Sequence, residues 1–193
     1  MPPKFKFTKT QIVEAAFKLV RVKGWDALTT RSLADALGTS ARPIYSYFKS
    51  MEELEEEISK KGVDLLYDYM VQERTGDPWH DHGIGYVMFA QKEKRLFRGL
   101  NDDKHIRYFK EYGEALWVKC SASLSGYPPF KNLSDEQIYT VQFHRWLMAH
   151  GLAFQVSTHP PGVWTDDVIV LKMRQGSIAI LDGLKKQFAE TTG

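Results

Sequence analysis

A short predicted helix near residue 45 carries side chains suited to contact DNA. Successive residues of an α-helix are about 100° apart, so Arg42, Tyr45 and Lys49 lie opposite the apolar pair Ile44 and Phe48. The planar guanidinium of Arg42 can bond both acceptors on the major-groove edge of guanine. Tyr45 and Lys49 are better placed for phosphates, which fix the register of a protein on the duplex. This pattern predicts a DNA-reading surface.

The elements that must position these side chains are two short helices joined by a tight turn. The first helix is expected over residues 30–37 and ends at Gly38, because glycine readily adopts the left-handed conformation found after a helix end. The second is expected over residues 41–48, with Ser40 as its N-cap. Two such helices with a turn that contains glycine form a helix-turn-helix. The start of its second helix enters the major groove.

The run LTTRSLADALGTSARPIYSYFKSMEEL resembles the DNA-binding domain of the TetR family of transcriptional regulators. The resemblance covers Phe7 to about Leu54 and includes the signature at Ile44 to Phe48. It implies phosphate contacts for two residues, Thr30 and Arg31. It implies base or phosphate contacts for five more: Ala41, Arg42, Pro43, Tyr45 and Tyr47. At Met51 the family commonly has a lysine that meets a phosphate, so we expect Lys49 to substitute for it.

Composition and charge favour a protein with a separate DNA-binding head. The 193 residues are 43% hydrophobic, which suffices for a core, and contain no apolar run of 18 residues. Residues 1–50 have a formal charge of +6, and the remaining 143 residues have −4. A basic head on an acidic body is typical of nucleic-acid readers. The N-terminus lacks the apolar region of a secretory signal, so we expect a cytoplasmic protein without a membrane segment.

The helical spacing of apolar residues and the helix-capping signals predict an all-α fold. Capping boxes are expected at three helix starts, namely Thr8–Gln11, Ser50–Glu53 and Ser134–Gln137. Thr165 is expected to cap the last helix. Further helices are expected over residues 79–91 and 102–124, the latter broken near Gly113. We predict an N-terminal three-helix helix-turn-helix DNA-binding domain over residues 1–50, and a C-terminal helical domain for ligand binding and dimerisation over residues 51–193.

Aromatic residues after residue 78 could line a cavity between helices, where small-molecule sites are common. The alternative is that they are core, since aromatic residues at helical spacing usually are. The candidate ligand-binding residues are Phe89, Phe109, Tyr112, Trp117, Phe143 and Trp146. They predict an apolar or aromatic effector whose identity cannot be read from the sequence.

Apolar and small residues recur along the last predicted helix, near a 3.5-residue period. With the preceding helix, they suit a four-helix dimer interface. The alternative is that they complete the core of one chain, and the family resemblance favours the dimer. The candidate dimerisation residues are Met173, Ser177, Leu181, Leu184 and Phe188.

Other chemistries have little support in the sequence. There is no glycine-rich phosphate loop, nucleophile elbow or metal-ligand spacing, so we expect neither an enzyme nor a cofactor. His80 and His82 are expected at the surface rather than on a metal, and Cys120 is expected to pack rather than sense oxidation. Lys4, Lys6 and Lys9 form either a phosphate-binding arm or a solvated tail.

The resulting prediction is a ligand-responsive transcriptional regulator with no catalytic activity. Repression is the usual mode of the family, and a homodimer would bind a palindromic DNA operator until a small effector releases it. The alternative is a helical interaction protein whose degenerate head binds DNA without sequence preference.

Overall fold

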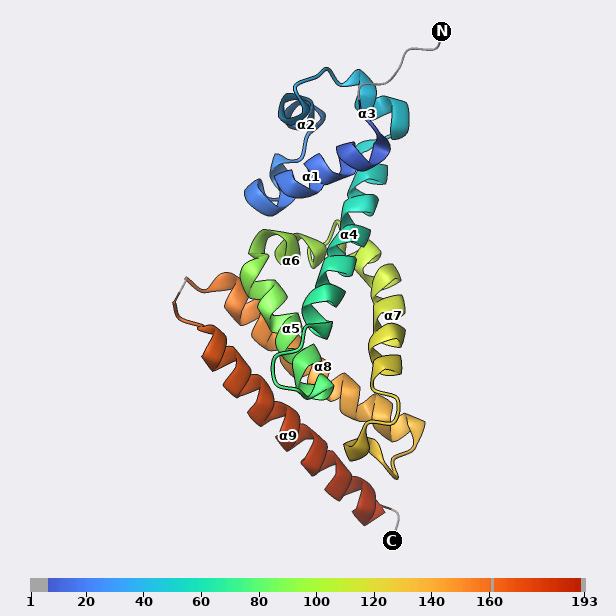
Figure 1. The fold of residues 1–193 in the computed structure, drawn as a ribbon, viewed down its shortest axis with the longest axis vertical. Helices are drawn as coiled ribbons and strands as arrows, with labels where there is room; N and C mark the ends of the chain where they lie inside the picture. Colours follow the sequence, from blue (N-terminus) through green and yellow to red (C-terminus); the bar gives the residue numbers. More distant parts are fainter. Residues whose placement is uncertain (1–6, 161, 192–193) are drawn as a thin grey trace. The chain divides into compact units, whose positions relative to one another are not determined.

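The computed structural model describes residues 7–160 and 162–191, and within these ranges every regular element is a helix. Figure 1 follows them along the chain. The first four α-helices are α1 (Lys9–Lys23), α2 (Thr30–Leu37), α3 (Arg42–Tyr47) and α4 (Met51–Val71), with the 3₁₀ helix η1 (Trp25–Ala27) between α1 and α2. They are followed by α5 (Pro78–Lys92), α6 (Lys94–Leu100), α7 (Ile106–Ser123), η2 (Pro128–Phe130), α8 (Asp135–Thr158) and α9 (Asp166–Thr191). The predicted all-α class is confirmed.

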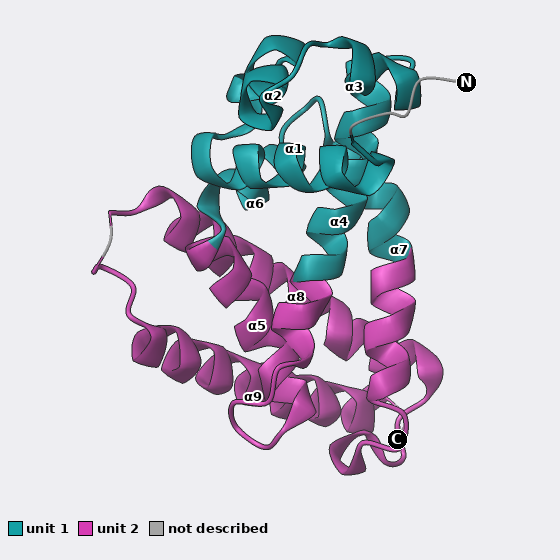
Figure 2. Ribbon diagram, turned by 45° about the horizontal axis from the view of Figure 1, so that its top comes forward, with its two compact units in different colours: residues 1–65, 93–114 teal, residues 66–92, 115–193 magenta. Residues whose placement is uncertain are grey.

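The chain divides into two compact units, which Figure 2 shows in two colours. Unit 1 comprises residues 1–65 and 93–114, and unit 2 comprises residues 66–92 and 115–193. Helices α4 and α7 each contribute residues to both units. The predicted border after residue 50 concerns the division of function, and it stays a prediction.

Helix starts follow the predicted local signals at two of the three capping boxes. The side chains of Thr8 and Ser134 each accept from the backbone N–H three residues later, and Gln11 and Gln137 return the bond. At the third, Ser50 accepts from the N–H of Glu53 at 3.4 Å. The Glu53 carboxylate, however, accepts from the N–H of Lys49 at 2.7 Å, one residue before the expected partner. Thr165 accepts from the N–H of Val168, as predicted for the start of α9.

The core of unit 1 holds the helix-turn-helix against α1, α4 and α6. Its fully buried side chains come from each of these elements, and they include Ile12, Val20, Leu33, Ile44, Leu54, Ile58, Leu96 and Leu100. Helix α6 packs against α1, and Arg21 of α1 donates from Nε to Glu93 at 2.8 Å. Gly62 lies inside α4, where a Cβ would meet the Leu100 side chain at 3.1 Å. Close packing holds these helices together.

Unit 2 is organised around α5, whose residues 79–90 are all buried. Helices α8 and α9 pack on α5 and on each other. Two close approaches depend on glycine: a Cβ on Gly85 would lie 2.1 Å from the Tyr69 carbonyl oxygen, and a Cβ on Gly176 would lie 2.0 Å from the Met148 sulfur. Larger residues at these positions would force the helices apart.

The surface location expected for His80 and His82 is wrong, because both are buried on α5. The His82 ring lies 3.3 Å from the Ser123 hydroxyl. Burial and the nearby charge of Arg145 lower the pKa of His82 to about 4. Arg145 is itself buried, donates to the Trp79 carbonyl and stacks over the Trp79 ring at 3.8 Å. Burial lowers the pKa of Arg145 to about 10.

One helix was not predicted, and another predicted helix needs correction. The segment after α5 forms a separate helix, α6, which the sequence did not reveal. The break expected near Gly113 is wrong: α7 runs through it, and its first helical residue is Ile106 rather than Asp102. Asp102 instead accepts from the backbone N–H groups of Lys104 and His105, at 3.0 and 2.8 Å, ahead of the helix. A single glycine inside a helix costs only about 1 kcal/mol, so it need not interrupt one.

No described helix combines the length and apolarity needed to cross a membrane.

Candidate DNA-binding and ligand-binding sites

Helices α2 and α3 form the helix-turn-helix that the sequence predicts. Thr29 starts α2 by accepting from the N–H of Ser32. Gly38 ends it with φ 62° and ψ 41°, the left-handed conformation that glycine adopts without strain. The apolar sides of the two helices face inward, and Leu33 and Ile44 are fully buried. This packing fixes which side of α3 is turned to solvent.

The outward side of α3 carries the predicted DNA-binding side chains. Arg42 and Lys49 are exposed, and Tyr45 is 53% exposed despite its large ring. The Tyr45 hydroxyl lies 3.0 Å from the Thr30 hydroxyl, so α2 and α3 are joined on this side. Next to Thr30, Arg31 is exposed. The arrangement presents two guanidinium groups, an ammonium group and a phenol, all donors that phosphates and base edges accept.

Tyr47 projects from the last turn of α3 and is 36% exposed. Its hydroxyl donates to the Phe7 carbonyl oxygen at 3.0 Å, which ties α3 to the residue preceding α1. Lys9, at the start of α1, pairs with Glu57 of α4. Lys4 and Lys6, the other lysines of the possible phosphate-binding arm, lie outside the described residues.

The predicted N-cap of α3 is wrong by one residue. Ala41, not Ser40, occupies that position, and no side chain caps the helix. A side-chain cap accepts from the second or third N–H of a helix. Pro43 occupies the second position and has no N–H to donate. The N–H of Ile44, the third, bonds to the Ala41 carbonyl at 3.1 Å. Arg42 is helical although it precedes a proline.

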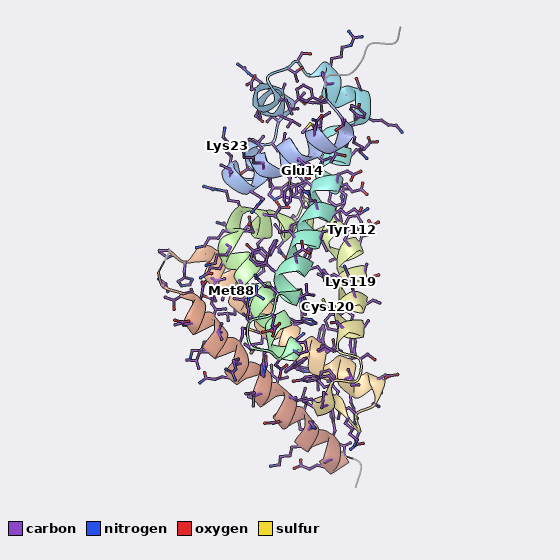
Figure 3. The ribbon with its side chains drawn as sticks, in the orientation of Figure 1. Glu14, Lys23, Met88, Tyr112, Lys119 and Cys120 are labelled. Atoms are coloured by element: carbon purple, nitrogen blue, oxygen red, sulfur yellow. The ribbon has the colours of Figure 1, made fainter. Side chains whose placement is uncertain are left out.

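The six predicted ligand-binding residues are distributed over the two units. Phe109 and Tyr112 belong to unit 1, whereas Phe89, Trp117, Phe143 and Trp146 belong to unit 2. The Tyr112 hydroxyl, on a side chain labelled in Figure 3, donates to Glu56 at 2.9 Å. Desolvation and this carboxylate raise the pKa of Tyr112 to about 12. Phe89 is fully buried with its ring edge-on to Tyr69, a core environment.

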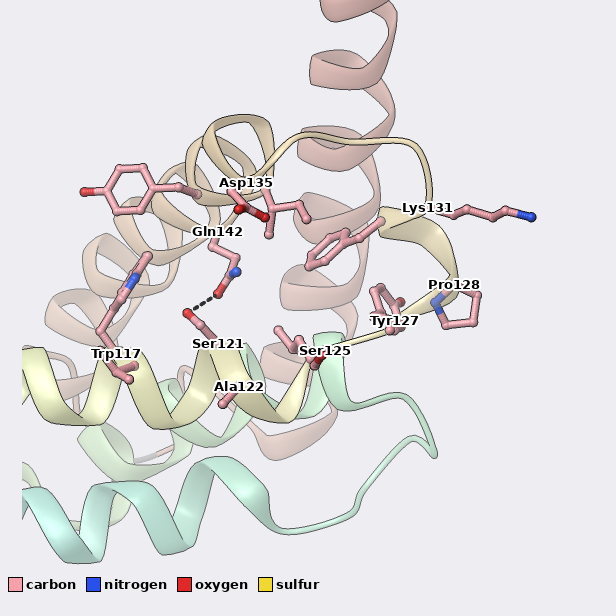
Figure 4. A pocket seen from close by; sticks show the side chains of 15 residues that line it. Trp117, Ser121, Ala122, Ser125, Tyr127, Pro128, Lys131, Asp135 and Gln142 are labelled. Atoms are coloured by element: carbon pink, nitrogen blue, oxygen red, sulfur yellow. Dashed lines mark hydrogen bonds between the residues drawn. The ribbon is translucent and has the colours of Figure 1, made fainter.

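Three of the unit 2 residues are connected by ring contacts. Tyr139 lies between Trp117 and Phe143, with ring centroids 5.6 and 5.9 Å apart, and Phe143 contacts Trp146 at 5.7 Å. Trp117 lines a pocket of about 900 Å³ between the end of α7, η2 and the start of α8 (Figure 4). The other five predicted residues do not line it. The sequence analysis missed the lining residues Gln142, Tyr127 and Phe130. Tyr127 and Phe130 come from η2 and the residue before it, which lie beside α7 and α8 only in the folded chain.

Three of the predicted dimerisation residues are buried within unit 2, and the other two are half-buried. Met173 and Ser177 are fully buried, and Leu181 is 7% exposed. Leu184 and Phe188 are half-buried against the cluster around Trp79. The exposed large apolar side chains of α8 and α9 are Tyr139, Leu147, Phe154, Leu171 and Ile178. A role of the five predicted residues in a dimer stays a prediction.

Fold and site together define a helix-turn-helix protein with a further helical unit. Residues 12–58 match the sequence model described as "Bacterial regulatory proteins, tetR family". The matched segment spans most of α1, the helix-turn-helix and the first turns of α4, so the similarity to this family of transcriptional regulators rests on the N-terminal part of the chain.

Known proteins resemble the chain to different extents. An uncharacterized HTH-type transcriptional regulator of Mycobacterium tuberculosis is 34% identical over 59 residues, which cover 31% of this chain and 27% of that relative. A transcriptional regulator from Rhodococcus sp. Rha1 has the same fold, with a TM-score of 0.69, 14% identity and coverage of 92% of this chain and 97% of that structure. The TetR family transcriptional regulator PfmR from Thermus thermophilus aligns with a TM-score of 0.53, 18% identity and coverage of 89% and 97%.

Proposed function

We propose that the protein is a ligand-responsive transcriptional repressor that binds a palindromic DNA operator as a homodimer. The observation that carries this proposal is the outward side of α3, where Arg42, Tyr45 and Lys49 are exposed while Ile44 and Phe48 are buried. The exposed phenol of Tyr45, beside exposed guanidinium and ammonium groups, offers a donor that DNA phosphates accept. In this proposal, Arg42 reads a base, and Thr30, Arg31, Tyr45, Tyr47 and Lys49 position the protein on the backbone, with Ala41 and Pro43 at the groove.

A homodimer would present two copies of α3, which matches the two-fold symmetry of a palindromic operator. Helix-turn-helix dimers place their recognition helices about 34–36 Å apart, one turn of duplex, so that they enter successive major grooves. The proposed interface uses exposed apolar residues of α8 and α9, in particular Leu171 and Ile178, which are 53% and 47% exposed. Residues seven apart lie on the same side of a helix, so the two can meet a partner together.

A small molecule would release the operator by a shift in population. An effector changes DNA affinity only if it binds the DNA-competent and DNA-incompetent states with different affinity. We propose that unit 2 binds this effector. The mainly apolar interior of that unit favours an apolar or aromatic molecule.

Selection of genomic DNA fragments on the purified protein tests the proposal. We expect a common palindrome, bound by the wild-type protein and weakened by about 1–3 kcal/mol in Arg42→Ala if that side chain reads a base. Lys186→Ala, which removes an exposed lysine of α9, is the control and should leave binding unchanged. Recovery of unrelated fragments, with weak binding that Arg42→Ala does not affect, would favour a degenerate head that serves protein interaction.

Sedimentation of the free protein tests the dimer separately. The double variant Leu171→Glu, Ile178→Glu should sediment as a monomer, because it places two charges in the proposed apolar interface. Val22→Glu is the matched control, since Val22 of α1 is 56% exposed and lies in unit 1. A double variant that remains dimeric would exclude this pair from the interface.

A further inference from the structure

The pocket between α7, η2 and α8 has a lining that is almost entirely uncharged. Its volume of about 900 Å³ lies in the range of about 300–1,000 Å³ that is usual for small-molecule sites. Of its fifteen lining residues, two carry charges, Lys131 and Asp135, and both are exposed and of opposite sign. Figure 4 shows the Lys131 side chain directed away from the pocket. The lining therefore offers no cluster of charge of either sign.

The walls of the pocket are aromatic and aliphatic. Phe130 and Leu124 are buried lining residues, and the Tyr127 ring meets Phe130 edge-on at 5.0 Å. On the outer side, Tyr139 is 54% exposed and Val118 is 67% exposed. A flat apolar molecule in the pocket would contact the buried wall and also cover these two exposed side chains. Removing that apolar surface from water favours binding.

One buried polar side chain faces this apolar lining. Gln142 is 5% exposed, lines the pocket, and accepts from the Ser121 hydroxyl at 3.0 Å. Figure 4 shows this bond across the pocket, with Trp117 on one side and Tyr127 on the other. Among the described residues, the other end of the Gln142 amide has no hydrogen-bond partner. This end is not among the side-chain atoms sealed from solvent without a partner, so it is accessible from the pocket, and a ligand hydroxyl or carbonyl can bond to it whichever way the amide is oriented.

We propose that this pocket binds an uncharged, mostly apolar, planar molecule whose single polar group bonds to Gln142. The proposal rests on the proposed function only for the consequence of binding, which would be release of DNA. Binding itself is a property of unit 2, and it is measured without DNA. A protein that recognises no operator can still bind the molecule, and the two failures are therefore distinguishable.

The first test uses two fluorescent probes with the same ring system. N-phenyl-1-naphthylamine is neutral, and 1-anilinonaphthalene-8-sulfonate adds a sulfonate. We expect a saturable rise in fluorescence with the neutral probe and at least tenfold weaker binding of the anionic one. Absence of binding by the neutral probe, or tighter binding of the anionic probe, would overturn the proposal.

Matched variants of α7 then locate the probe. Ala122 lines the pocket, whereas Ala115, which is also exposed on the same helix, does not. Ala122→Trp should abolish binding of the neutral probe, and Ala115→Trp should leave it unchanged. Val118→Trp is a second blocking variant, at a position so exposed that the fold should tolerate it. Equal probe binding by wild type and both blocking variants would place the probe elsewhere and overturn the proposal.

The role of Gln142 is tested by displacement of the neutral probe with 1-naphthol and naphthalene, which differ by one hydroxyl. In the wild-type protein, 1-naphthol should displace the probe about threefold to tenfold more effectively, the usual advantage of one hydrogen bond. In Gln142→Leu the two compounds should become equal while naphthalene binding is retained. An unchanged advantage of 1-naphthol in this variant would assign the polar contact to another group and overturn the role of Gln142.

Discussion

The Trp25 indole lies directly on Gly99, so that a Cβ added to the glycine would come within 1.8 Å of the ring. Trp25 belongs to η1, in the segment between α1 and the helix-turn-helix, and Gly99 belongs to α6. On the same indole the His105 ring packs at a centroid distance of 4.0 Å. Residues far beyond the helix-turn-helix segment thus complete the packing of unit 1.

Substitution Gly99→Ala should destabilise unit 1. The added methyl group cannot be accommodated without displacing the Trp25 ring, and overpacking of this kind costs about 1–3 kcal/mol. Thermal unfolding followed by circular dichroism should show a lower melting temperature. Gly113→Ala is the matched control, because nothing lies within 4 Å of a Cβ there. It should be neutral or stabilise the helix by about 0.5–1 kcal/mol. Equal melting temperatures for the two variants would contradict the packing argument.

Cys120 should resist alkylation in the folded protein. Burial raises the pKa of its thiol to about 11, and the thiolate is the form that reacts. At pH 8, iodoacetamide should modify it slowly in native protein and rapidly in denaturant, as measured by mass spectrometry. The variant Cys120→Ser, Ala122→Cys moves the thiol to an exposed position on the same helix and should react rapidly without denaturant. Fast native modification of the wild type would instead support a sensing role for Cys120.

The stability of unit 2 should fall as the pH is lowered from about 6.5 toward 4. The folded-state pKa of His82 is about 4, below the ordinary value of 6.5. Between these values the unfolded chain takes up a proton that the folded chain does not. The contribution is fully present above pH 6.5, is lost as the pH falls, and is on the order of 3 kcal/mol.

Denaturant titrations across this range should show a shallower pH dependence in His82→Gln than in the wild type. Only the slope is compared, since the substitution can change stability at every pH. His144→Gln, at an exposed histidine of α8, serves as the control and should keep the wild-type slope. Parallel slopes for wild type and His82→Gln would assign the acid sensitivity to other groups.

Local signals predicted much of the fold, and long-range contacts explain most of the errors. The boxes at Thr8 and Ser134 depend on residues three apart, so they are visible in the sequence. The separation of α5 from α6 occurs at Glu93, whose backbone is not helical and whose carboxylate pairs with Arg21, 72 residues away. No local pattern reveals such a contact.

The DNA-binding surface depends mainly on local sequence, whereas the pocket of unit 2 depends on long-range contacts. Arg42 and Tyr45 lie on one short helix, so their spacing predicts their common direction. The pocket is closed by Tyr127 and Phe130, which η2 and the loop before it bring onto α7 and α8. Aromatic residues such as Phe89 have the same helical spacing whether they are core or lining. Their burial, which the sequence does not give, decides between the two.

Removal of the Lys49 side chain should weaken DNA binding without changing sequence preference. Lys49 is exposed, and its fixed contact in the structure is through its backbone N–H to Glu53, so Lys49→Ala should leave the start of α4 intact. Each phosphate contact contributes about one unit to the dependence of log affinity on log salt concentration. Titrations between low and moderate salt should therefore show a slope reduced by about one.

Arg42→Ala provides the contrast for that experiment. If Arg42 reads a base, its loss should relax preference for the operator over a scrambled duplex, whereas Lys49→Ala should weaken both duplexes about equally. An unchanged salt slope in Lys49→Ala would show that this ammonium group does not meet a phosphate. In that case no side chain would replace the lysine that the family commonly has at the position of Met51. The DNA-binding surface would then make one contact fewer with the DNA phosphates.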